Sequence, residues 1–173
     1  MFIKSYGQMW NPDIVNWNGT GTGKLIGNIK RDKSWIGIDF WNAKGIYVLH
    51  SDFKSIYVGK AFSTSIGKRL QDHLADRLAG RWDMFSWYSV SGPRITRRDV
   101  SQPGQRLVKP EIITDTLEAL AILIADPALN RKREKLKHAY EAFQPENATP
   151  MTIRTYLEKI LGKLSADPSQ PTP

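Results

Sequence analysis

Two strand-like runs flank a polar turn and decide the fold: Gly45-Ile46-Tyr47-Val48-Leu49-His50, Ser51-Asp52-Phe53-Lys54 and Ser55-Ile56-Tyr57-Val58-Gly59-Lys60. Both runs are rich in β-branched and aromatic residues, so they predict a β-hairpin. Side chains alternate between the faces of a strand, and the aliphatic residues are expected on the core side. Tyr47 and Tyr57 share the other face only if the loop has an odd length or a bulge, and we predict that register.

Further strands and helices are predicted on both sides of this hairpin. Strand-like runs occupy residues 24–30, 35–41 and 84–90. Apolar spacing and N-terminal caps predict helices over residues 65–80, 111–125, 126–143 and 149–164. The sequence therefore predicts an α+β domain with a small three-stranded, mainly antiparallel sheet flanked by helices, with N-terminal β additions and a C-terminal helix.

The length of 173 residues indicates a single domain. Residues 1–44 are expected to pack on the same domain as residues 45–164, and residues 165–173 to form a disordered tail. The longest apolar run covers residues 119–125, far fewer than the ~20 that a membrane-spanning helix needs. With no secretory signal and no cysteine, the expected location is the cytoplasm, and disulfides and thiolate metal sites are excluded.

Basic residues outnumber acidic ones, with 25 Lys and Arg against 17 Asp and Glu and a formal net charge of +8. Such an excess favours a polyanionic partner, because neutralised phosphates release their counterions. Residues 91–109 predict a long basic loop, or a loop holding a short strand. The predicted nucleic-acid contacts are the cations of this loop and of the helix at 126–143: Arg94, Arg97, Arg98, Arg106, Lys109, Arg131, Lys132 and Arg133. A solvated surface that only adds solubility is the alternative.

The two tyrosine triplets resemble the GIY-YIG nuclease superfamily. Gly45-Ile46-Tyr47 looks like the first signature and Tyr57-Val58-Gly59 like the second, and Lys60 follows directly. Arg69-x3-His73 on the next predicted helix is similar to the restriction-enzyme-like branch of that superfamily. The match covers roughly residues 44–132, and residues 81–87 look like a little-described prokaryotic subgroup.

The resemblance implies a hydrolase that cleaves phosphodiester bonds with one Mg²⁺ or Mn²⁺. Glu118 stands in the place of the metal-binding acid, and Asn130 would orient a ligand or brace the site. A hard cation takes few protein oxygens and several waters, and it would polarise the scissile phosphate. Glu118 also has a structural interpretation, since an acid in so apolar a stretch needs a cationic partner or a hydrogen-bond donor if it is buried.

Two residues are candidates for the general base, and the choice stays open. Tyr47 needs a pKa depressed by nearby positive charge such as Lys60, whereas the ordinary pKa of His73 is already near neutrality. Arg69 would donate two hydrogen bonds to phosphate oxygens in the transition state. Tyr57 is expected to hydrogen-bond in the same pocket, where Gly59 would let backbone approach the substrate.

The sequence thus predicts a metal-dependent DNA endonuclease for restriction, defence or repair. Its substrate would be duplex or branched DNA, with which the protein would associate in the nucleoid, and a restriction role would favour a homodimer. A non-catalytic nucleic-acid-binding module on the same fold and a basic RNA-binding protein are the alternatives. Strand aromatics are mostly core residues, but Trp82, Trp87 and Tyr88 are also candidates for stacking on unpaired bases.

Overall fold

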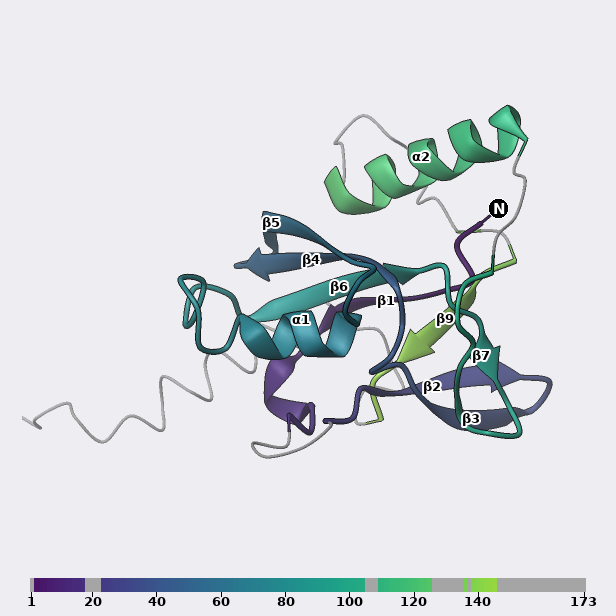
Figure 1. The fold of residues 1–173 in the computed structure, drawn as a ribbon, viewed down its shortest axis with the longest axis horizontal. Coiled ribbons are helices and arrows are strands. Elements are labelled where there is room, and N and C mark those ends of the chain that lie inside the picture. Colours follow the sequence, from purple (N-terminus) through teal and green to yellow (C-terminus); the bar gives the residue numbers. More distant parts are fainter. Residues whose placement is uncertain (1, 18–22, 105–108, 126–135, 137, 146–173) are drawn as a thin grey trace, which may run out of the picture.

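The computed structural model describes residues 2–17, 23–104, 109–125, 136 and 138–145. Its main feature is a seven-stranded mixed sheet with the order β3-β2-β9-β1-β6-β4-β5 (Figure 1). The strands are β1 (Ser5–Trp10), β2 (Ile26–Arg31), β3 (Ser34–Asp39), β4 (Gly45–Ser51), β5 (Lys54–Ala61), β6 (Met84–Ser89) and β9 (Tyr140–Phe143). Strands β1 and β9 are parallel, and the other neighbours are antiparallel. A separate ribbon pairs β7 (Pro93–Arg94) with β8 (Asp99–Val100).

Two α-helices lie on opposite sides of this sheet (Figure 1). Helix α1 (Ile66–Asp72) starts at Ser65, whose side chain accepts a hydrogen bond from the N–H of Lys68. Helix α2 is longer (Pro110–Ala125), and a short 3-10 turn, η1 (Pro12–Ile14), follows β1. No helix in the described part of the chain is long and apolar enough to cross a membrane.

The predicted small three-stranded sheet flanked by helices is wrong. Strands β4, β5 and β6 are the three predicted ones and are neighbours, but the sheet continues through four more strands, and the described residues contain only two α-helices. Strand β1 was not predicted, and the end of the predicted helix at 126–143 forms β9 instead. Since β9 pairs with β1 and β2 from the other end of the chain, local apolar spacing could not reveal it.

Other predicted elements stand as follows. The strands predicted over 24–30, 35–41 and 84–90 are confirmed as β2, β3 and β6, and the helix predicted over 111–125 is confirmed as α2. The helix predicted over 65–80 ends at Asp72, because Asp76 accepts the N–H of Leu78 and contacts His73, and such local bonds compete with a helix. The predicted helix at 149–164, the tail at 165–173 and most of residues 126–137 lie outside the described residues.

The hairpin register is confirmed. A bulge interrupts the pairing of β4 with β5 between Leu49 and His50. Tyr47 therefore pairs with Gly59 while Leu49 pairs with Tyr57, so that both tyrosines share one face. The expectation that the aliphatic residues face the core holds for Val48, which is fully buried, but not for Val58, which is 53% exposed. The expectation that the tyrosines face away from the core is wrong, because Tyr47 is fully buried.

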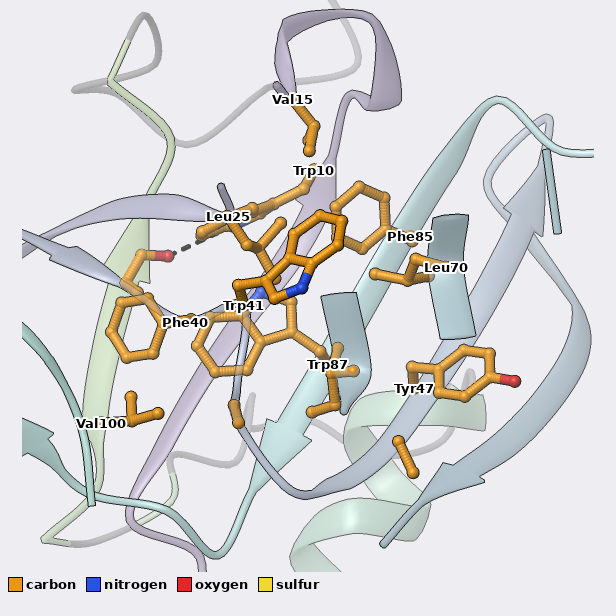
Figure 2. Close-up of a cluster of buried hydrophobic side chains, with 14 of the residues drawn as sticks. Trp10, Val15, Leu25, Phe40, Trp41, Tyr47, Leu70, Phe85, Trp87 and Val100 are labelled. Carbon is orange, nitrogen blue, oxygen red and sulfur yellow. Dashed lines mark hydrogen bonds between the residues drawn. The ribbon is translucent and has the colours of Figure 1, made fainter. Parts of the chain in front are cut away.

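Apolar clusters cover both faces, which explains why Tyr47 is buried. On one face, Tyr47 and Leu49 pack with Leu70 of α1 in a cluster that also holds four tryptophans: Trp10, Trp41, Trp82 and Trp87. Trp10 donates to the carbonyl of Ala142 at 3.2 Å and ties β1 to β9. Figure 2 shows Tyr47 at the edge of this cluster, with its hydroxyl pointing away from the tryptophans. On the other face, Val48 shares a second cluster with two residues of α2, Ala119 and Leu120.

Candidate functional site

A buried phenol, an imidazole and a carboxylate form a hydrogen-bonded chain. The hydroxyl of Tyr47 lies 2.7 Å from Nε2 of His73, and Nδ1 of His73 lies 2.7 Å from Oδ2 of Asp76. Strand β4 supplies Tyr47, and His73 is the C-terminal cap of α1, which packs on that strand's face. The imidazole is therefore fixed at both nitrogens, with 2% of the residue exposed.

Tyr57 and Arg69 border this chain. The ring of Tyr57 is centred 6.2 Å from that of Tyr47 and 5.3 Å from that of His73. Arg69 lies one helical turn before His73, and its side chain is 36% exposed beside Asp72, at 3.8 Å. The structure thus brings together the four residues that the sequence placed in one site from a strand pair and a helix: Tyr47, Tyr57, Arg69 and His73.

Burial sets the protonation state of the phenol. It raises the pKa of Tyr47 to about 12, against the lowering effect of the Arg69 charge, and the neighbouring Tyr57 raises the pKa further. The phenol thus keeps its proton near neutrality and donates it to Nε2 of His73. In neutral His73 the single ring N–H proton then lies on Nδ1 and is donated to Asp76, a tautomer assigned from the hydrogen-bond network. The pKa of Asp76 is lowered, first by the N–H of Leu78 and then by His73.

Gly59 has a role that the sequence interpretation assigned differently. A Cβ added to Gly59 would lie 2.3 Å from both Cζ and the hydroxyl oxygen of Tyr47. The missing side chain therefore makes room for the phenol itself, where the sequence suggested room for a substrate.

Lys60 and Glu118 do not join the tyrosines. Lys60 pairs with Ile46, one residue along from the pair of Tyr47 with Gly59, so its side chain is on the opposite face of the sheet. Glu118 is exposed on α2, the helix that packs on the face of Val48. Because Glu118 is exposed, the condition under which it would need a buried partner is not met. Alternation along β4 puts Tyr47 and Val48 on opposite faces, and the face that α2 covers is not encoded locally.

The residues beside Tyr47 do not fit the metal that the resemblance implies. Glu118, the one carboxylate offered for it, is separated from the tyrosines by the sheet. His73 already contacts both Tyr47 and Asp76, so neither of its ring nitrogens is free for a metal. In the described ranges no group of three or more His, Cys, Asp or Glu residues is arranged to hold a metal ion.

The predicted nucleic-acid contacts fall into three groups. Arg94 is bound through two nitrogens to Asp99, at 2.6 and 2.5 Å, and is therefore engaged within the protein. Arg97, Arg98 and Lys109 are exposed. The remaining predicted cations lie outside the described residues: Arg106, Arg131, Lys132 and Arg133. The predicted site residue Asn130 also lies outside them.

The proposed stacking aromatics are core residues. Trp82, Trp87 and Tyr88 are 8%, 0% and 1% exposed, so their rings are not available to bases. The sequence interpretation also missed Asp76, although its spacing of three residues from His73 is a usable signal, because residues three apart on a helical turn are neighbours.

Comparisons with known proteins find no relative. No model of a protein family matches the chain, and no curated protein or solved structure matches it either. Function is therefore inferred from the geometry around Tyr47 and from the charge of the chain.

Proposed function

We propose that this chain is a DNA endonuclease that hydrolyses phosphodiester bonds at the cluster of Tyr47, Tyr57, Arg69 and His73. The observation that carries the proposal is the hydrogen-bonded chain from Tyr47 through His73 to Asp76, with a guanidinium beside it. A net charge of +8 favours a polyanionic substrate. The ordered motif that resembles GIY-YIG nucleases supports phosphodiester chemistry.

The proposed chemistry moves one proton along this chain. An attacking water gives a proton to the oxygen of Tyr47 while Tyr47 passes its own proton to Nε2 of His73, and Asp76 stabilises the resulting imidazolium. The water oxygen bonds to phosphorus, the bond from phosphorus to the 3′ oxygen breaks, and the proton returns along the chain to that oxygen. Because the phenol never has to exist as a free phenolate, a pKa of about 12 for Tyr47 suits this role. His73 is then the net base.

Arg69 is the proposed phosphate-binding group. Its planar fork donates two parallel hydrogen bonds to phosphate oxygens, which develop charge in the transition state. Both Arg69 and Tyr57 are partly exposed, whereas Tyr47 and His73 are not. The substrate is therefore expected to approach from the side of Arg69 and Tyr57.

Relaxation of a supercoiled plasmid tests this proposal. The wild type is assayed in Mg²⁺, in Mn²⁺ and with a chelator, next to Tyr47→Phe and Arg69→Lys. We expect nicking by the wild type, and rates at least about a hundredfold lower for both variants. Tyr140→Phe is the matched control, because Tyr140 is 42% exposed on β9 and should leave the rate unchanged. Equal nicking by wild type and Tyr47→Phe would refute the assignment.

A non-catalytic nucleic-acid-binding module is the second candidate. One observation favours it: the side chain of Tyr47 is completely buried, as expected of a residue that serves the core. A wild-type protein that retains DNA but nicks it under none of the three conditions would favour the module. Retention of structured RNA in preference to DNA would favour an RNA-binding protein.

A further inference from the structure

A second feature of the molecule lies on the hairpin formed by β2 and β3, at the lower right of Figure 1 and away from α2. Trp35 in β3 is 49% exposed, in contrast to the buried indoles of the core. The residue directly across from it in β2 is Lys30, which is also exposed. An exposed indole next to a cation on a flat strand pair is the arrangement that holds a stacked base and its phosphate.

The sheet face around Trp35 is open in the described part of the chain. On β2, Gly27 and Ile29 are buried, while Ile26 and Lys30 at alternate positions are exposed. The strand residues that share the second apolar cluster with α2 are Tyr6, Val48 and Tyr88, from β1, β4 and β6. Helix α2 therefore covers the half of this face built by β1, β4 and β6.

Neighbouring residues give this open face the shape of a platform. Phe143 of β9 meets the indole of Trp35 edge to face at 5.6 Å and thereby fixes it against the sheet. The next cross-strand pair on this face is Gly37 with Asn28. Beside the indole there is therefore a position without a side chain and a half-buried amide. A stacked base on Trp35 would thus have an amide beside it that can hydrogen-bond to base edges.

The charges around the platform favour an anionic ligand. Lys33 is exposed in the turn of the hairpin next to Asp32, and Arg31, the last residue of β2, is exposed on the face opposite Lys30. Glu141, half-buried on the face of Phe143, is the opposing acid on β9. Three basic residues, Lys30, Arg31 and Lys33, thus outnumber the two acids, so this end of the hairpin as a whole carries a net positive charge close to Trp35.

We propose that this platform, formed by Lys30, Lys33, Trp35 and Phe143, binds single-stranded nucleic acid. A base stacks on Trp35, and Lys30 and Lys33 contact the adjacent phosphates. Duplex DNA fits less well, because its bases are already stacked on one another inside the helix and offer the indole no open face. The proposal deepens the proposed function by naming an unpaired strand as the part of the substrate held here. Binding is measured apart from cleavage, so failure of one leaves the other standing.

The test is fluorescence anisotropy with a labelled oligothymidine of about 15 nucleotides and its matched duplex, using the full-length protein. We expect the wild type to prefer the single strand. Trp35→Ala should weaken binding of the single strand about tenfold or more. Trp35→Phe keeps an aromatic ring, so its affinity for the single strand should stay within about threefold of the wild-type affinity. Phe62→Ala is the control, since Phe62 is 66% exposed but lies after β5.

A charge variant tests the phosphate contact independently of the indole. Lys30→Gln should lower the slope of log affinity against log salt by about 0.7, as expected for one lost contact to a single strand, whereas Lys54→Gln on β5 should not. Three results would overturn the proposal: equal affinity of wild type and Trp35→Ala, an equal loss in Phe62→Ala, or tighter binding of the duplex. A salt slope unchanged by Lys30→Gln would remove Lys30 from the platform and contradict the proposal as stated.

Discussion

Gly59 lies directly opposite Tyr47 in the pairing of β4 with β5, and its backbone touches the phenol at the oxygen end. The tyrosine side chain therefore lies across the neighbouring strand and not straight up from its own. This orientation places the hydroxyl at the C-terminal end of α1, where it hydrogen-bonds to Nε2 of His73. The position of the phenol thus depends on the absence of a side chain on the neighbouring strand.

Gly59→Ala is expected to displace the ring of Tyr47. The added Cβ would come to 2.3 Å from two atoms of a fully buried side chain, so the free energy of unfolding should fall by about 1–3 kcal/mol. Loss of nicking should accompany it. Gly37→Ala on β3 is the matched control, because its nearest neighbour would be 3.5 Å away. Urea denaturation of both variants measures the difference, and equal stability of the two would contradict the packing described here.

Tyr47→Phe separates the hydroxyl from the ring. The phenylalanine keeps the apolar contacts of a buried residue but leaves Nε2 of His73 without its partner, so the free energy of unfolding should fall by about 1–3 kcal/mol. A thermal or urea transition measures this, and Tyr140→Phe should leave it unchanged. A fall far beyond this range would mean that the ring repacks, and nicking by this variant would then say nothing of the proton chain.

Local sequence patterns were sufficient to predict the β4–β5 hairpin and the helix that carries Arg69 and His73. Alternation, a turn and the bulge put Tyr47 and Tyr57 on one face, and the spacing of Arg69 and His73 put both on one helix. Each of these relations spans only neighbouring elements. The grouping of the four side chains in one site came from the resemblance to the ordered GIY-YIG motif, and these local relations are consistent with it.

Relations between distant segments could not be obtained this way. Strand β9 exists because β1 and β2 flank it, and the four residues 140–143 carry too short a pattern to distinguish a strand from the end of a helix. Glu118 was assigned by its order along the chain, but the face that α2 covers is set by the apolar contacts of Ala119 and Leu120. Order in sequence therefore did not establish proximity in space.

Glu118→Gln is expected to have little effect on nicking, less than about twofold, because the exposed carboxylate lies across the sheet from Tyr47. The initial rate of plasmid nicking, measured beside Tyr47→Phe, is the readout. Glu111→Gln, an exposed acid in the first turn of the same helix, is the matched control. If the nicking rate of Glu118→Gln were as low as that of Tyr47→Phe while Glu111→Gln kept the wild-type rate, Glu118 and Tyr47 would share a site. That result would conflict with the fold described.

The burial of His50 leads us to expect that the stability of the protein depends on pH. It is buried on the opposite face from Tyr47, with Nε2 2.9 Å from the hydroxyl of Ser86, and burial lowers its pKa to about 4, against the opposing charge of Asp83. In the unfolded chain the pKa is near 6.5, so the unfolded state takes up a proton first as the pH falls. The contribution of His50 to the free energy of unfolding is therefore fully present above about pH 6.5 and is lost as the pH falls towards about 4. At about pH 5 this loss amounts to about 2 kcal/mol.

Urea denaturation at about pH 7 and about pH 5 measures this loss, because the change between the two values reports the protons taken up on unfolding. His50→Gln keeps a polar side chain of similar size and removes the titration, so its change between the two pH values should be about 2 kcal/mol smaller than that of the wild type. Identical pH dependence of His50→Gln and wild type would mean that His50 titrates alike in the folded and unfolded chain, which a histidine enclosed by β4 and β6 should not do.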